Sequence, residues 1–399
     1  MTAPAGVVIV GGGVAGATAA QTLRSGGYPG PVTIIGAEPG LPYRRTALSK
    51  DLLSADLRPE RIGLRKLEVW AEDDVQIRSG TTVLEIDSAA ATVRLDDGSV
   101  LGFQALILAT GAAPVRPGWL DQDVPCLRTL ADAERIRDAI SADPGPLVIV
   151  GGGLIGLELA ASVVADDREV IVLEAAERLL SRVAPEAVSG FIADLHRARG
   201  VQCRLGSPVQ SADARQVRTR DGQTLRGTVV AALGAVPDTV LARAAGLAVT
   251  EAGIVVDGAL RTGTAGIYAA GDCAAVPDPR TGEPARGEHW FGAQDQGAAA
   301  ARSVLADLAG RPAPVYAEVP RAWTMQYGTN LQFVGWPTAP GAVTVDGDLT
   351  VGDLTVGQKP EATITVAGPG GLVGAVTVGR AAAARDLRTR MAESLGTVV

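Results

Sequence analysis

Residues 7–23, VVIVGGGVAGATAAQTL, combine a short apolar run with a glycine-rich turn and an alanine-rich segment. This pattern predicts a buried parallel strand, a tight turn and a helix. Gly11, Gly13 and Gly16 have the GxGxxG spacing of a dinucleotide-binding turn. In such a turn the first glycine allows the bend, the second admits a pyrophosphate, and the third lets the helix pack on the strand. We therefore expect a phosphate at the helix N-terminus.

The same pattern returns at residues 147–164, LVIVGGGLIGLELAASVV. The glycines at matching positions are Gly151, Gly153 and Gly156. Each copy precedes a second apolar strand that ends in a carboxylate, Glu38 in PVTIIGAE and Glu174 in EVIVLE. A carboxylate at that place accepts hydrogen bonds from the ribose hydroxyls of an adenosine. One such motif is a weak signal, but two complete sets predict that one chain binds two dinucleotides.

The duplication extends beyond the glycine turns. Residues 83–114 and 209–237 both contain alternating strands around an Asp-Gly turn, followed by an apolar strand, a glycine turn and a proline. Residues 319–399 add short β segments and a final helix. The predicted fold class is α/β, with two Rossmann-like domains that each carry an antiparallel β meander, plus a small C-terminal α+β domain.

The composition disfavours several other classes of protein. With 36 basic and 44 acidic residues, the net charge of −8 disfavours nucleic-acid binding, which depends on neutralising many phosphates. No apolar run approaches the roughly 20 residues of a membrane span, and the first residues lack the basic start of a signal peptide. We therefore expect a cytoplasmic protein with no membrane partner. The cysteines form no CxxC pair and only two histidines occur, so we expect neither a dithiol centre nor a protein-held metal.

Further motifs accompany the two glycine turns in a fixed order. They include PYRRTALSK (42–50), LATGAAP (108–114), IYAAGDC (267–273), GEHWFGAQDQG (287–297) and WTMQYGTNLQFVG (323–335). On these motifs the chain resembles, over nearly its whole length, the FAD-dependent ferredoxin reductases of bacterial oxygenase and cytochrome P450 systems, within the pyridine-nucleotide disulfide reductase superfamily. The resemblance implies an enzyme that passes electrons from NADH through FAD to a [2Fe-2S] ferredoxin, as a monomer or a homodimer.

The resemblance also implies domain limits and site residues. The FAD-binding domain would comprise residues 1–112 and 239–318, the NAD(H)-binding domain 113–238 and the C-terminal domain 319–399. The residues implied for FAD are Gly11, Gly13, Val14, Ala15, Gly16, Glu38, Arg45, Lys50, Ala109, Thr110, Gly111, Arg128, Asp272, Glu288, His289, Trp290 and Trp323. Those implied for NAD(H) are Gly151, Gly153, Leu154, Ile155, Gly156, Glu174, Arg182 and Gly234.

Lys50 stands out because only three of the 36 basic residues are lysines. Its retention suggests that a compact ammonium is needed there, although an ordinary surface lysine is the alternative. The resemblance places Lys50 beside Glu158 as the catalytic pair near the flavin N5, where hydride arrives. Disulfide reductases of the superfamily relay electrons through a dithiol beside the flavin, usually in a helix. The resemblance implies that this helix here is TALSKDLL (46–53), which has no cysteine.

Three positions depart from the family pattern: Thr46-Ala47, Gly292 and Thr324-Met325. They cluster on the side implied for the flavin and the electron acceptor, so the identity of the partner stays open.

Two other functions also stay open. One is NADH-dependent reduction of a small molecule or of oxygen on the same scaffold. The other is a flavin redox sensor without catalysis, which the retained Lys50 and Glu158 disfavour.

Two charge features give sharper expectations. Glu174 predicts a preference for NADH, because its carboxylate would repel the 2′-phosphate of NADPH by up to about 4 kcal/mol at close range.

Arginines and a lysine near residues 58–66 and 385–390 either converge on a docking patch for an acidic ferredoxin or are ordinary solvated charges. These residues are Arg58, Arg61, Arg65, Lys66, Arg385, Arg388 and Arg390.

Overall fold

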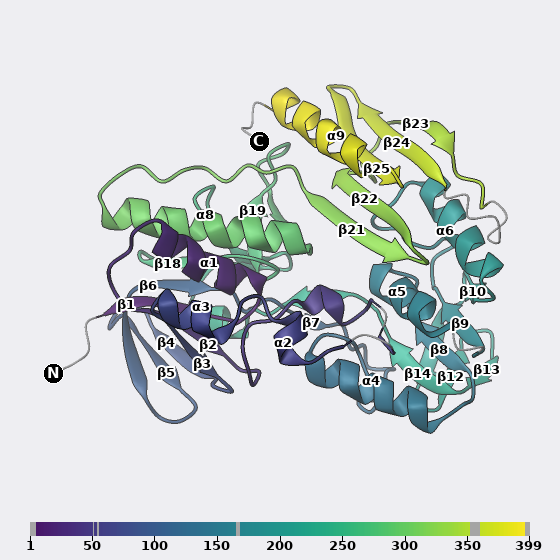
Figure 1. The fold of residues 1–399 in the computed structure, drawn as a ribbon, viewed down its shortest axis with the longest axis horizontal. Coiled ribbons are helices and arrows are strands. Elements are labelled where there is room, and N and C mark those ends of the chain that lie inside the picture. Colours follow the sequence, from purple (N-terminus) through teal and green to yellow (C-terminus); the bar gives the residue numbers. More distant parts are fainter. Residues whose placement is uncertain (1–4, 51, 54–55, 165–167, 352–359, 396–399) are drawn as a thin grey trace.

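The computed structural model describes residues 5–50, 52–53, 56–164, 168–351 and 360–395. It contains three sheet-centred parts, which Figure 1 shows from one side. We call them the first region, built on the first glycine turn, the second region, built on the second glycine turn, and the C-terminal sheet. In the described part of the chain, no helix is both long and apolar enough to cross a lipid bilayer.

The first region centres on a mixed sheet whose central parallel strand, β1, is fully buried. In spatial order its strands are β3 (Val75–Ser79), β2 (Val32–Gly36), β1 (Gly6–Val10), β6 (Val100–Leu108), β5 (Thr92–Leu95) and β4 (Val83–Asp87), with β18 (Ile267–Ala269) also paired to β6. β1 runs parallel to β2 and β6, whereas β4 and β5 form the predicted antiparallel meander with the start of β6. Since β18 joins this sheet, the chain returns to the first region after completing the second.

Helices and small elements surround this sheet. α1 (Val14–Ser25) and α8 (Trp290–Leu308) pack against each other above it (Figure 1). The remaining elements are η1 (Arg45–Ala47), α2 (Pro59–Ile62), α3 (Leu67–Glu72), α7 (Val240–Ala244), β16 (Val249–Thr250), β17 (Gly253–Val255), β19 (Ala274–Pro277) and β20 (Pro284–Arg286). The expected helix over residues 46–53 is wrong for its described part, which is one 3-10 turn followed by irregular turns, and Asp51 lies outside the described residues.

The second region repeats this plan. Its parallel sheet has the order β10 (Gln202–Arg204), β9 (Val170–Leu173), β8 (Leu147–Val150) and β14 (Thr228–Ala231). Its antiparallel meander comprises β11 (Val209–Ala212), β12 (Gln216–Thr219) and β13 (Thr224–Arg226), and its helices are α4 (Leu130–Ala142), α5 (Leu154–Val163) and α6 (Glu186–Ala198). The two passages between the regions pair as a ribbon of β7 (Ala112–Pro114) and β15 (Ala235–Pro237).

The C-terminal sheet is antiparallel. It has the order β21 (Arg321–Gln326), β22 (Thr329–Gly335), β25 (Gly371–Val378), β24 (Glu361–Gly368) and β23 (Ala342–Asp348). α9 (Ala381–Ser394) packs on one face, through a cluster that includes Leu387 and Met391. The other face shares a hydrophobic core with α5 and α6 of the second region. The predicted α/β class, with two repeated halves and an α+β part at the C-terminal end, is confirmed.

Candidate active site

The glycines of the first turn lie in two different surroundings: Gly11 and Gly16 are packed against protein backbone, whereas Gly13 faces open space. Gly11 has a φ of +122°, and a Cβ atom there would lie 2.0 Å from the carbonyl oxygen of Ala109. A Cβ atom on Gly16 would lie 2.1 Å from the oxygen of Gly11, so the fold itself requires both glycines. On Gly13, by contrast, a Cβ atom would meet no protein atom within 4 Å. α1 begins directly after Gly13 without a side-chain cap, which leaves its first N–H groups and this open space to an anionic ligand.

The second turn has the same geometry. Gly151 has a φ of +116° and lies against the oxygen of Ala232, whereas Gly153 again faces open space. α5 begins after Gly153 without a side-chain cap. Glu174 follows the end of β9, where its two oxygens accept hydrogen bonds from the backbone N–H groups of Gly152 and Ala176, both at 2.8 Å. This carboxylate is therefore held in a fixed orientation beside the second turn.

A cavity of about 930 Å³ opens beside the first turn and is lined by all three parts of the molecule. The predicted residues that line it are Gly11, Gly13, Val14, Ala15, Glu38, Arg45, Lys50, Ala109, Thr110, Gly111, Arg128, Leu154, Ile155, Glu158, Asp272, Glu288, His289, Trp290 and Trp323. The predicted residues absent from this lining, all within the described chain, are Gly16, Gly151, Gly153, Gly156, Glu174, Arg182 and Gly234. Of these, Arg182 and Gly234 are close together, since a Cβ atom on Gly234 would lie 2.9 Å from Arg182 Nη2.

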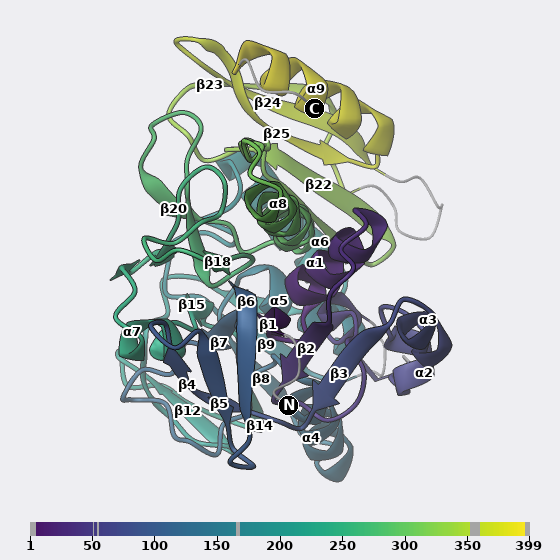
Figure 2. The ribbon, with the colours of Figure 1, turned by 90° about the vertical axis from the view of Figure 1, so that its left-hand side faces the viewer.

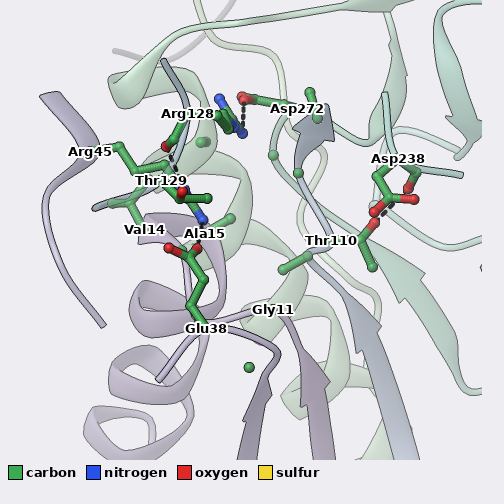
Figure 3. Close-up of a pocket in the computed structure, with 18 of the residues that line it drawn as sticks. Gly11, Val14, Ala15, Glu38, Arg45, Thr110, Arg128, Thr129, Asp238 and Asp272 are labelled. Atoms are coloured by element: carbon green, nitrogen blue, oxygen red, sulfur yellow. Dashed lines mark hydrogen bonds and ion pairs between the residues drawn. The ribbon is translucent and has the colours of Figure 1, made fainter. Parts of the chain in front are cut away.

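Polar side chains are paired across this cavity. Figure 3 shows Arg45 directed toward Glu38, with which it forms an ion pair, and Arg128 toward Asp272, at 3.0 Å. Tyr43 Oη donates to Glu38 Oε2 at 2.5 Å and accepts from the N–H of Leu130. Burial raises the pKa of Tyr43, so its hydroxyl stays a donor. These bonds hold the Glu38 side chain in place after the end of β2, the strand next to β1, which leads into the first glycine turn.

Lys50 and Glu158 meet at the wall of the cavity that the second region contributes. Lys50 Nζ lies 2.6 Å from Glu158 Oε1 and 5.5 Å from the ring centroid of Trp323. The Glu158 side chain is 5% exposed, and two hydroxyl groups besides the ammonium donate to it: Thr324 Oγ1 to Oε1 at 2.7 Å, and Ser49 to Oε2. A buried carboxylate needs such compensation, which here comes from two segments far apart in sequence, Ser49-Lys50 and Thr324.

The chain matches the family model described as pyridine nucleotide-disulphide oxidoreductase over residues 5–297. The chain belongs to this family. Among curated relatives it is 37% identical to "Rhodocoxin reductase" of Rhodococcus erythropolis over 88% of this chain and 82% of that relative. It is 38% identical to "Anthranilate 1,2-dioxygenase system ferredoxin--NAD(+) reductase component" of Burkholderia cepacia, over 88% of this chain and 86% of that one.

A solved structure supports the same placement within the pyridine nucleotide-disulphide oxidoreductases. The chain superposes with a TM-score of 0.89 on a protein of the "covalent putidaredoxin reductase-putidaredoxin complex", at 31% identity and covering 98% of this chain and 94% of that one. The chain is thus an oxidoreductase of the putidaredoxin reductase-like branch. The resemblance inferred from the motifs is confirmed.

This oxidoreductase has no dithiol in its described residues. Cys126, Cys203 and Cys273 are all free, and no cysteine is among the described residues of the cavity wall. Cys273 follows Asp272 but is fully buried, and its Sγ donates to the carbonyl oxygens of Leu108 and Ala270. The three cysteines therefore form no disulfide in the part of the chain that the structure describes.

The departures from the family pattern lie in different surroundings. Thr324 is fully buried and bound to Glu158, whereas Met325 is 41% exposed. Gly292 faces open space in the first turn of α8, and Thr46-Ala47 form part of η1. Cavity residues missed from the sequence include Tyr43 and Ser49, although both belong to the PYRRTALSK motif that also contains Arg45 and Lys50.

The basic residues singled out from the sequence do not converge. Figures 1 and 2, which differ by a quarter turn, both place α2 far below α9. On the α2 side, Arg58 and Arg61 pair with Asp56, and Arg65 pairs with Asp73. On α9, Arg388 pairs with Glu318. The hypothesis of one joint patch is therefore wrong, because the two segments belong to different parts of the molecule.

Proposed function

We propose that the protein is a ferredoxin--NAD(+) reductase, which moves electrons from NADH through a bound FAD to a [2Fe-2S] ferredoxin that serves an oxygenase or a cytochrome P450. The observation that carries this proposal is the meeting of three features at one cavity. They are the open glycine turn of the first region, the start of α5 from the second region, and the Lys50–Glu158 pair between them. The named relatives with this activity support it.

The cavity suits FAD in size and chemistry. Its volume of about 930 Å³ falls within the range of cofactor sites, and the space at Gly13 would admit a pyrophosphate to the N-terminus of α1. We assign the adenosine ribose to Glu38, and the remaining polar groups of FAD to the Arg128–Asp272 pair and the Thr110-Gly111 turn. We further assign residues 1–112 and 239–318 to the FAD-binding domain and 319–399 to the C-terminal domain.

We assign NAD(H) to the second glycine turn and residues 113–238. Gly153 leaves the same open space for a pyrophosphate as Gly13, and Arg182 lies over Gly234 at the carboxyl end of β14. Glu174 would accept the ribose hydroxyls of NADH, and it forms no ion pair with a described residue. A carboxylate that no described cation neutralises would repel the 2′-phosphate of NADPH, which supports a preference for NADH.

The residues of the chain would orient the reaction rather than exchange protons or form covalent bonds. Bound FAD would supply the conversion of one hydride into two single electrons. Glu158 holds the ammonium of Lys50 at the cavity wall, which sets a fixed positive charge there. Trp323 and Trp290 line the same cavity, and the ring centroids of Phe291 and Trp323 lie 4.9 Å apart.

The test compares electron acceptors. Purified protein loaded with FAD is mixed with NADH without oxygen, and the visible flavin absorption should disappear. NADH turnover is then measured with a [2Fe-2S] ferredoxin plus cytochrome c, and separately with oxygen alone. We expect the ferredoxin to raise the turnover at least about tenfold over oxygen, a difference of about 1.4 kcal/mol in the barrier. Turnover that is equally fast with oxygen alone would instead favour an NADH oxidase, and flavin that NADH does not bleach would favour a redox sensor.

A further inference from the structure

A line of buried hydrogen bonds leads from Glu158 into the interior. Thr324 Oγ1 lies 2.7 Å from Glu158 Oε1 and 3.3 Å from Gln326 Nε2. Gln326 Oε1 lies 2.7 Å from His196 Nε2, and His196 Nδ1 lies 3.0 Å from Tyr327 Oη. Thr324, Gln326 and His196 have no exposed surface, so this network is shielded from water.

The network joins three elements of the fold. Thr324 and Gln326 are two residues apart on β21, and so they share the face of the strand that packs on the second region. Glu158 comes from α5 and His196 from α6. Around them, the same core contains apolar side chains such as Leu331 and Phe333. A polar line through an apolar core costs stability unless every group on it is paired.

Donors and acceptors fit together in only one direction. The Glu158 carboxylate only accepts, so the Thr324 hydroxyl donates to it and itself accepts from the amide N–H of Gln326. The amide oxygen of Gln326 then requires a donor, which is the Nε2–H of His196. Nδ1 of the neutral ring accepts from the hydroxyl of Tyr327. Burial lowers the pKa of His196 to about 4, which agrees with a neutral ring at ordinary pH.

We propose that Thr324, Gln326 and His196 are positioning residues that orient the Glu158 carboxylate and thereby fix the ammonium of Lys50 in the cavity. The proposal rests on the proposed function, because it assigns the Lys50–Glu158 pair to the hydride-transfer site. Ser49 donates to the other oxygen of Glu158, so each carboxylate oxygen accepts a hydrogen bond from a hydroxyl group. Thr324 is the link that touches Glu158, which makes it the position to test.

The first test compares two substitutions of Thr324. Thr324→Val removes the hydroxyl donor at nearly constant volume, and Thr324→Ser keeps it. We expect the rate of flavin reduction by NADH, measured in a rapid-mixing experiment, to fall about tenfold in Thr324→Val at unchanged KM for NADH. Thr324→Ser should stay within about twofold of the parent. A parent-like rate in Thr324→Val, or an equal loss in Thr324→Ser, would overturn the proposal.

The second test needs no turnover. A double-mutant cycle combines Thr324→Val with Glu158→Met in the full chain as purified, and urea unfolding measures each variant. Because the hydroxyl matters only when the carboxylate is present, we expect the two effects to be coupled by about tenfold in the unfolding equilibrium constant. Additive effects would overturn the proposal. If NADH fails to reduce the flavin of the parent protein, the proposed function fails, while the cycle still decides whether Thr324 orients Glu158.

Discussion

The two glycine turns are alike in backbone geometry and differ in what surrounds them. The first opens into a cavity of about 930 Å³, and its carboxylate, Glu38, is paired with Arg45. The glycines of the second do not line that cavity, and among the described residues only backbone N–H groups donate hydrogen bonds to its carboxylate, Glu174. The same motif is therefore followed by an ion-paired carboxylate in the first region and, among the described residues, by a carboxylate without an ion pair in the second. This difference supports our proposal that the first turn holds FAD and that the second takes up NADH.

The two regions also differ in how they are tied to the C-terminal sheet. α8 of the first region is tied to β21 by the ion pair of Asp295 and Arg321, at 3.0 Å. In the second region, the neutral ring of His196 on α6 forms a hydrogen bond with Gln326 on the same strand, at 2.7 Å. A guanidinium keeps its charge in mild acid, whereas a buried histidine that must stay neutral is sensitive to it.

The largest predicted effect follows from this contrast. The pKa of His196 is about 4 in the folded protein, below the ordinary value of 6.5. The unfolded chain therefore binds a proton between these values that the folded chain does not. The contribution of neutral His196 to the free energy of unfolding is fully present above pH 6.5. It is lost as the pH falls from 6.5 toward 4, a loss of about 3 kcal/mol.

The measurement is urea unfolding at a series of pH values for the parent and for His196→Phe, which keeps a ring but cannot titrate. Carboxylates change the free energy of unfolding with pH by the same amount in both proteins. The difference between the two pH dependences therefore reports the contribution of His196 alone. Identical slopes between pH 4 and 6.5 would show that His196 titrates normally in the folded state, and the contrast between the two attachments would then disappear.

The next prediction uses Gly13 and Gly153 as a matched pair, since a Cβ atom at either position meets no protein atom. Valine at each should leave the fold intact and block only the ligand. We expect Gly13→Val to weaken FAD binding about 100-fold, so that the protein is purified without colour. Gly153→Val should retain FAD and raise the KM for NADH. Loss of FAD in both variants would show that the turns do not bind separate ligands.

Features of the fold and of the site that depend on residues close together in the sequence could be predicted. Contacts between residues far apart in the sequence could not. The glycine spacing, the strands before it and the carboxylates after it are local patterns, and they predicted the repeated fold. The Lys50–Glu158 pair joins residues that are 108 apart, and only resemblance suggested it. The bonds of Thr324 and His196 had no local signal, because a buried threonine and a buried histidine look like ordinary core positions until β21 is placed on α5 and α6.

The expected helix over residues 46–53 and the joint basic patch failed for related reasons. The segment around Lys50 is fixed by tertiary contacts, such as the Ser49 and Lys50 bonds to Glu158, rather than by helical hydrogen bonds. The basic residues were grouped by composition, although their neighbours Asp56 and Asp73 already pair three of them. Charge counts along a sequence do not reveal which partners the fold brings to them.

The smallest predicted effect tests the two carboxylates against each other. Glu174→Gln removes the charge that a 2′-phosphate would meet, so the preference for NADH, which we expect to be at least about tenfold in kcat/KM, should fall to near unity. Glu38→Gln is the control, because it should leave that preference unchanged and instead loosen FAD, whose site it helps to form with Arg45. Steady-state kinetics with both nucleotides, at fixed ionic strength, measures the ratio. If Glu174→Gln keeps the full preference for NADH, the second turn selects its nucleotide by shape, and the charged carboxylate no longer distinguishes it from the first.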